Sequence, residues 1–366
     1  MILLYADDPG GANFLAPLPA ALAARGLAAR FVVDPALSGY ASDRGMPVVT
    51  RDVVETPGQA LAGASLLVVG TSENPECFGH LLTGAARRLG IPSLGVVDLE
   101  VNAGRRFHGA GEAPLAHAPD ALAVPDAGTR DAFVALGFSA GHIHVCGHPH
   151  FDLVRQRRVA FLAEDRTEMR RTQFPGAPAG RPVWLFVAEG VDQLNPAASF
   201  RSDGYTLQGR RDTDFRAAIV LEEVLDAARD LSPRPWIVLR LHPKSRLEDF
   251  DVCRAEIDAV STGGDPLPLV WAADLVIGMT SMLLFEAGLL GRPHVAVVPR
   301  VEERHWLPAL AAVLTPSVST REQLSVFLAA PPPGAGDAAV PDHSTERVVQ
   351  AVVHCLSQRR TACSPP

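Results

Sequence analysis

Several features that mark common protein classes are missing from this sequence of 366 residues. It has no extended basic run and a formal net charge of -8, so we expect no nucleic-acid groove. Its most apolar window, DLVIGMTSMLLFEAGLLG, is interrupted by Asp274 and Glu286, so we expect no transmembrane segment. The N-terminus, MILLYADD, lacks a basic region, which predicts a first strand and not a signal peptide.

Cysteine is scarce and shows no pairing pattern. The five cysteines are scattered without a CxxC pair, which predicts unpaired thiols in a reducing cytoplasm. The expected location is therefore the cytoplasm, with peripheral attachment to the inner membrane as the alternative. No HExxH motif is present. The stretch GHIHVCGHPH crowds four histidines around Cys146, but a strand followed by a loop explains it better than a metal site does. We therefore expect neither a metal nor a cofactor.

What the sequence does contain is an alternation of short apolar runs with amphipathic runs. ILLYA, ASLLVVGT and DALAVP each precede a helix-like segment, and the pattern resumes after residue 181 with PVWLFVAEG and WIVLRLHP. Buried strands that alternate with helices predict a parallel sheet covered on both faces. The fold class is therefore α/β, with two doubly wound, Rossmann-like domains facing a cleft. The expected parts are an N-terminal domain (1–151), an inter-domain connection (152–181), a C-terminal domain (182–330), a Pro/Gly-rich linker (331–343) and a C-terminal helix and tail (344–366).

Polar residues that directly follow the apolar runs are the candidates for a site. In doubly wound folds, ligands bind at the carboxyl ends of the strands. The first half offers the following candidates at these positions: Asp7, Asp8, Gly10, Gly11, Asn13, Thr71, Ser72, Asp98 and Asn102. The second half offers Glu189, His242, Thr280 and Ser281.

The segment ADLVIGMTSMLLFEAGLLGRP runs from a strand directly into a helix. Thr280 or Ser281 would cap this helix, and its first N–H groups and positive dipole end would suit a phosphate. Glu286, on the same helix, could accept hydrogen bonds from ribose hydroxyls. In LRLHPKS, the proline fixes a turn after a strand and leaves His242 and Lys244 free to meet an anion. The alternatives are a capped helix without a ligand and a surface loop with a chance histidine.

These segments resemble the GT-B glycosyltransferase superfamily. ADLVIGMTSMLLFEAGLLGRPHVAVVP is similar to the unit with which that superfamily binds a nucleotide sugar, and VCGHPHFD resembles the end of its amino-terminal domain. The HP pair and the Thr-Ser dipeptide resemble the HP and S motifs of bacterial capsule transferases that use CMP-activated sugars, including polysialyl- and Kdo-transferases, and of CDP-glycerol glycerophosphotransferases. The resemblance implies that His242, Thr280 and Ser281 bind the donor phosphate, and that the N-terminal domain is the acceptor side.

The stretch DDPGGAN loosely resembles the acidic pair that carries the presumed base in the polysialyltransferase-like enzymes. Asp7 or Asp8, with Asp8 slightly favoured, would take the proton from an acceptor hydroxyl, and the two glycines would let the backbone approach a ligand. The alternative is an acidic N-cap for a helix that starts near Asn13. Arg105 and Arg106 suggest either an anionic acceptor or donor carboxylate, or simply a solvated turn.

The first hypothesis is a bacterial, metal-independent GT-B glycosyltransferase for polysaccharide or glycoconjugate synthesis. It would move a nonulosonic or Kdo-type acid from a CMP-activated donor to a glycan, lipid or protein acceptor. One alternative is a UDP-sugar 2-epimerase-like enzyme, because VVPRVEERHW echoes a segment of those epimerases, although GMTSM departs from their DSGG. A CDP-glycerol glycerophosphotransferase and a non-catalytic nucleotide-sugar-binding protein remain open as well.

Overall fold

The structure is a computed structural model, and it describes residues 1–191, 195–243, 245–307, 315–334 and 341–362. The chain divides into two units. The first comprises Met1–Leu153 together with Val340–Pro366, and the second comprises Val154–Ala339. The C-terminal segment, which the sequence analysis set apart, is thus grouped with the first unit.

The first unit is built on a seven-stranded parallel sheet in the order β3-β2-β1-β4-β5-β6-β7. Its strands are β1 (Ile2–Ala6), β2 (Ala29–Val33), β3 (Val49–Thr50), β4 (Leu66–Gly70), β5 (Ser93–Val96), β6 (Ala121–Val124) and β7 (Ile143–Val145). Strands β1 and β4 are buried along their whole length, as expected for strands covered on both faces.

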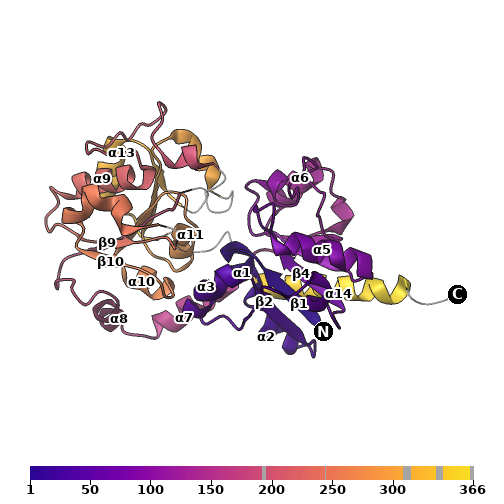
Figure 1. The fold of residues 1–366 in the computed structure, drawn as a ribbon. Helices are drawn as coiled ribbons and strands as arrows, with labels where there is room; N and C mark the ends of the chain where they lie inside the picture. The colour runs from indigo at the N-terminus through magenta and orange to yellow at the C-terminus, as the bar shows by residue number, and fades with distance from the viewer. Residues whose placement is uncertain (192–194, 244, 308–314, 335–340, 363–366) are drawn as a thin grey trace. The chain divides into compact units, whose positions relative to one another are not determined.

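Helices cover both faces of this sheet (Figure 1). They are α1 (Pro9–Leu15), α2 (Leu18–Ala23), α3 (Ser38–Asp43), α4 (Pro57–Ala60), α5 (Phe78–Leu89), α6 (Ala127–Ala135) and α14 (Ser344–Ala362), with short turns η1 (Pro35–Leu37), η2 (Ala103–Arg105) and η3 (Ala140–His142). Alternate residues of β1 supply the two cores: Ile2 and Leu4 pack with α1, α2 and α14, whereas Leu3 and Tyr5 pack with α4 and α5.

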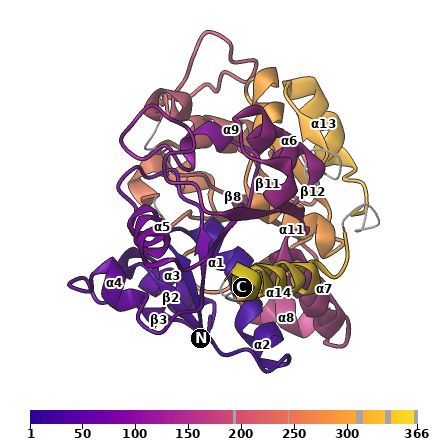
Figure 2. The same cartoon turned by 90° about the vertical axis from the view of Figure 1, so that its right-hand side faces the viewer.

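Helix α14 joins this unit from the far end of the sequence, and both Figure 1 and Figure 2 show it, in yellow, beside the strands of the first unit. Val348, Val349 and Val352 are fully buried in the core that β1 also lines. Near the start of the helix, Thr345 donates from its backbone N–H and its hydroxyl to Asp152, at 2.7 and 2.8 Å. Apolar burial and this polar contact together fix α14 against the first unit.

The second unit has a six-stranded parallel sheet in the order β10-β9-β8-β11-β12-β13. Its strands are β8 (Val183–Val187), β9 (Trp236–Arg240), β10 (Ala259–Ser261), β11 (Leu275–Gly278), β12 (His294–Val297) and β13 (Ser317–Val318). Its helices include α8 (Arg166–Gln173), α9 (Arg216–Ala228), α10 (Leu267–Ala272), α11 (Met282–Leu289) and α13 (Arg321–Ala329), with short turns η4 (Pro196–Ser199), η5 (Leu247–Glu256) and η6 (Val301–Trp306). Helix α7 (Pro149–Leu162) contains the boundary between the units. The expected α/β architecture of two Rossmann-like units is confirmed.

Each sheet reverses its strand order at one place. In the first unit the chain builds β1, β2 and β3 in one direction and then returns to the other side of β1 with β4. In the second unit β8 is flanked by β9 on one side and β11 on the other. Such a reversal leaves the carboxyl ends of the two central strands uncovered, which is where doubly wound folds bind ligands.

Helix α1 starts earlier than the sequence suggested. The expected start near Asn13 is wrong, because α1 begins at Pro9, a residue that suits the first helical position, and Asp8 is its N-cap. The helix also ends sooner, at Leu15, and α2 restarts after Pro17.

The two glycines in this helix permit close packing. A Cβ on Gly10 would overlap the carboxylate of Asp98. A Cβ on Gly11 would lie 3.1 Å from the Cα of Gly70, at the end of β4. These glycines were expected to let the backbone approach a ligand, whereas in the structure they bring α1 against the ends of β4 and β5.

We predict that Gly11→Ala lowers the free energy of unfolding by about 1–3 kcal/mol, because the added methyl group would press on the Cα of Gly70, a backbone atom that cannot move away. The matched control is Gly39→Ala in α3, where nothing lies within 4 Å of an added Cβ. The control should be neutral or stabilise by about 0.4–1 kcal/mol. Denaturant unfolding of the two variants measures the difference, and equal stabilities would contradict the packing role.

Candidate functional site

Asp7, the first residue after β1, is held by three donors. Its carboxylate accepts from the backbone N–H groups of Phe78 and Gly79, at 3.1 and 3.0 Å, and from the hydroxyl of Tyr5 at 3.1 Å. The first two donors open α5, so Asp7 binds the positive end of that helix. Burial raises the pKa of Asp7 to about 6 in spite of these hydrogen bonds. Asp7 thus has a clear structural task.

Asp8, the next residue, is less fully bonded. Its Oδ1 accepts from the N–H of Gly11 at 3.0 Å, which caps α1. Within the described part of the chain, Oδ2 receives no hydrogen bond. Burial, and after it the nearby charge of Asp98, raises the pKa of Asp8 to about 7. A carboxyl group with such a pKa can accept or release a proton near neutral pH.

Asp98, after β5, forms an ion pair that the sequence analysis did not foresee. Its Oδ1 accepts from Nη1 of Arg106 at 2.7 Å, and the same nitrogen lies 3.0 Å from the hydroxyl of Thr71, after β4. Arg106 also donates to the carbonyl of Val101, and only 5% of it is exposed. The solvated-turn interpretation is therefore wrong for Arg106. Asp8, Thr71, Asp98 and Arg106 meet at the carboxyl edge where the first sheet reverses.

The remaining candidates of the first unit are engaged in local contacts. The hydroxyl of Ser72 accepts from the N–H of Asn74 at 3.2 Å. The side-chain amide of Asn102 donates to Glu73 at 3.0 and 3.2 Å. Oδ1 of Asn13 accepts from the hydroxyl of Tyr40 at 3.0 Å. These bonds shape the loops at this edge, and a ligand role for Ser72, Asn102 or Asn13 stays a prediction.

In the second unit, Glu189 follows β8 and joins two other elements. Thr280, after β11, donates its backbone N–H to Glu189, and its hydroxyl lies 3.0 and 3.2 Å from the two carboxylate oxygens. Arg216, at the start of α9, pairs with the same carboxylate at 2.6 Å. In addition, the hydroxyl of Ser245 donates to the backbone carbonyl of Glu189 at 3.3 Å, which brings the turn after His242 to this edge.

Ser281, and not Thr280, caps helix α11. Its hydroxyl accepts from the N–H of Leu283 at 3.2 Å. The backbone N–H groups of Ser281 and Met282 find no acceptor in the part of the chain that the structure describes, so they remain available at the helix start. Glu286 is buried in the same helix, and Lys244 lies outside the described residues.

An ionic network that the sequence pattern did not predict extends from Glu189. Arg216 pairs with Glu303 as well as with Glu189, and Arg300 donates to Glu303 at 2.6 Å. Glu303 is fully buried, so both arginines compensate its charge. The guanidinium groups lie 5.2 and 5.1 Å from the ring of Trp306. The segment RVEERHW held the signal, since two acids between arginines and a tryptophan suit a buried network.

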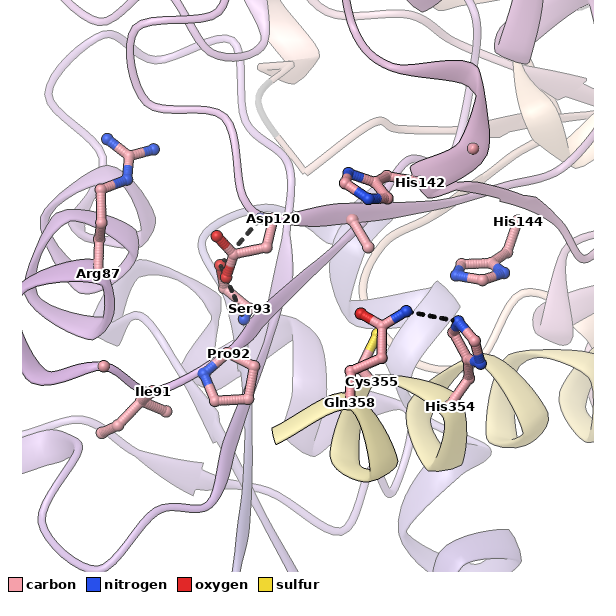
Figure 3. Close-up of a pocket in the computed structure, with 13 residues that line it drawn as sticks. Arg87, Ile91, Pro92, Ser93, Asp120, His142, His144, His354, Cys355 and Gln358 are labelled. Carbon is pink, nitrogen blue, oxygen red and sulfur yellow. Dashed lines mark hydrogen bonds between the residues drawn. The ribbon is translucent and has the colours of Figure 1, made fainter. Parts of the chain in front are cut away.

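A cavity of about 350 Å³ lies elsewhere in the first unit (Figure 3). It is lined by residues at the amino ends of β5, β6 and β7, including Ser93, Asp120 and His142, and by His354 of α14. The rings of His144 and His354 are 5.5 Å apart. The candidate residues occupy the opposite, carboxyl edge of the sheet, so this cavity is separate from them.

The histidines of GHIHVCGHPH have different surroundings. His144 lines the cavity, whereas His148 is buried between the rings of Phe14 and Phe151, with centroids at 4.8 and 4.6 Å. The described residues contain no group of three or more His, Cys, Asp or Glu side chains that could hold a metal ion. Likewise, no described helix has the length and hydropathy of a membrane span. The four described cysteines are unpaired and buried, as expected.

Solved structures of the same architecture exist. The UDP-GlcNAc 2-epimerase of Neisseria meningitidis, bound to UDP-GlcNAc, has a TM-score of 0.65 and 13% identity over 96% of this chain and 99% of its own. The UDP-GlcNAc 2-epimerase of Methanocaldococcus jannaschii has a TM-score of 0.64 and 13% identity over 96% of this chain and 99% of its own. A variant of the wall teichoic acid polymerase TagF has a TM-score of 0.55 and 15% identity over 98% of this chain and 84% of its own. The chain has the GT-B fold. No protein-family profile and no curated protein sequence matches it.

The raised pKa of Asp8 makes stability depend on pH. The pKa rises from 3.8 to about 7 on folding, so the folded chain binds this proton more tightly than the unfolded chain. The stabilisation of the fold by this proton is complete below about pH 4 and is lost as the pH rises through 7.

We predict that Asp8→Asn raises the melting temperature by several degrees at pH 8 and by clearly less at pH 5, because the amide keeps the cap without the buried charge and the cost of that charge grows with pH up to about 7. Asp7→Asn is the contrast, since it leaves the N–H of Gly79 facing an NH₂ group and should destabilise at both pH values. Thermal melts between pH 5 and 8 measure both effects. A pH-independent effect of Asp8→Asn would show that its carboxyl does not titrate in this range.

Proposed function

We propose that this chain is a metal-independent glycosyltransferase that uses a CMP-activated sugar, of the nonulosonic or Kdo type, as donor. The observation that carries the proposal is the Asp8 carboxyl, with a pKa of about 7 beside Asp98 and Arg106 at the switch point of the first sheet. Asp8 takes the proton of the acceptor hydroxyl while the oxygen bonds to the anomeric carbon. The bond from that carbon to the phosphate breaks, and CMP leaves with the electron pair.

We assign nucleotide binding to the second unit. The N–H groups of Ser281 and Met282, the dipole of α11 and the turn at His242 are the elements proposed to receive the phosphate. Arg216 and Arg300 already pair with Glu189 and Glu303, so the remaining donors suit a single phosphate group. This favours a nucleoside monophosphate donor. The motifs at His242 and at Thr280–Ser281 support the same assignment by resemblance.

A second candidate is an epimerase that acts on a UDP-sugar. Two observations favour it: the similarity to UDP-GlcNAc 2-epimerase structures, with TM-scores of 0.65 and 0.64, and the buried network around Glu303 in the segment that echoes those enzymes. Removal of the proton from the carbon that is epimerised would also need a base such as Asp8. A glycerophosphotransferase has weaker support, from the TagF similarity.

Nucleotide selectivity distinguishes these candidates. We predict that CMP at 100 times its dissociation constant stabilises the whole chain by about 2.7 kcal/mol, and that UDP at the same concentration has a smaller effect. His242→Ala should weaken CMP binding about tenfold or more without unfolding the protein, because His242 follows a strand and is only partly buried. His305→Ala, at an exposed position of the same unit, is the control. A larger shift with UDP than with CMP would favour the epimerase.

Turnover kinetics test whether Asp8 is the general base. We predict that Asp8→Asn reduces kcat for CMP release from a CMP-activated sugar by roughly 10²–10⁴-fold and leaves donor affinity nearly unchanged. Asp131→Asn, an exposed acid on α6, should turn over like the parent. Steady-state kinetics with a verified acceptor decide the matter. If Asp8→Asn also turns over like the parent, Asp8 is not the base, and Asp98 becomes the next candidate.

A further inference from the structure

His80, in the first turns of α5, contacts the loop that carries Arg106. It is 6% exposed, and its Nε2 lies 3.0 Å from the backbone carbonyl of Arg106. Its Nδ1 lies 3.4 Å from the carbonyl of Pro75, in the loop after β4. Since a carbonyl only accepts, the shorter contact indicates that Nε2 carries the proton and donates to Arg106. The ring thus connects α5 to the loop that follows β5.

The surroundings of His80 fix the ring. It stacks on His117, with centroids 4.8 Å apart and planes 14° apart. Burial, and then the neighbouring His80, Arg87 and His108, lower the pKa of His117. The stacked ring packs against His80 and limits its rotation.

From Arg106 the contacts continue to the proposed base. The guanidinium group donates to Asp98, whose carboxylate lies against Gly10, next to Asp8. The charged groups with the largest effect on Asp8 are Asp98, Arg106 and Asp7, and the thiol of Cys77 interacts with Asp8 as well. If Arg106 shifts, the charge of Asp98 is less neutralised, and a like charge beside Asp8 disfavours its ionisation.

We propose that His80 is a positioning residue: by holding the Arg106 carbonyl it fixes the guanidinium on Asp98, and so sets the pH at which Asp8 becomes available as a base. This inference rests on the proposed function for the role of Asp8 in turnover. The geometric part, that His80 controls the ionisation of Asp8, can be tested without any activity.

The test compares three substitutions of His80. His80→Phe keeps a stacking ring but has no donor, and His80→Met fills the site with a flexible chain that also lacks one. His80→Gln retains an N–H that can reach the Arg106 carbonyl. His142→Phe, an exposed histidine at the other edge of the sheet, is the control. Using two donor-free variants keeps the test valid if one of them does not fold.

The first measurement is the pH at which the gain in melting temperature from Asp8→Asn levels off, here called the midpoint, determined in each His80 background; it follows the pKa of Asp8 in the folded chain. We expect the midpoint to move up by about half a unit to one unit in His80→Phe and His80→Met, and to return in His80→Gln. In the kinetics, the acid limb of the pH profile of kcat should move by the same amount. His142→Phe should leave both midpoints unchanged.

The outcomes separate the two proposals. A shifted stability midpoint without turnover of any nucleotide sugar would support the role of His80 and count against the glycosyltransferase. An unchanged midpoint in both donor-free variants, whatever their loss of melting temperature, would overturn the positioning role and reduce His80 to a packing residue.

Discussion

The contact between helix α1 and the ends of β4 and β5 is the constraint on which the candidate site depends. Only glycine at positions 10 and 11 lets the helix approach the Asp98 carboxylate and the backbone of Gly70. This approach puts the N-cap Asp8 beside a second carboxylate. The charge of Asp98 raises the pKa of Asp8, and the guanidinium group of Arg106, which pairs with Asp98, lowers it. Packing and acid–base chemistry are therefore coupled through one helix.

In both units a carboxylate follows the strand at which the sheet reverses, but the hydrogen-bond and ion-pair partners of the two carboxylates differ. Glu189 is neutralised by Arg216 and bonded by Thr280, so it acts as a structural link between the ends of β8 and β11. Asp8 has one backbone donor and no arginine of its own. The same topological position thus holds a carboxylate paired with an arginine in the second unit and, in the first, a carboxyl group whose pKa burial raises to about 7.

Much of the fold could be predicted because strand burial and helix periodicity are local properties of the sequence. The position of Asp7, Asp8 and Asp98 at one edge also followed, since parallel strands end together. Arg106 could not be assigned, because its partner is set by how the loop after β5 closes. Thr280 was expected at a phosphate, whereas the structure gives its donors to Glu189, an acid 91 residues earlier in the chain. Such pairings depend on strand order, which periodicity does not reveal.

Asp7 and Asp8 show why the second acid is the better candidate for chemistry. Burial raises the pKa of both, but Asp7 gains three hydrogen bonds that stabilise its charge and hold α5 in place. Asp8 gains one, and an asparagine could make the same cap without a buried charge. A fold that needed only the cap would be more stable at neutral pH with the amide. The carboxyl group therefore costs stability that capping does not offset, and proton transfer is a role that requires an acid at this position.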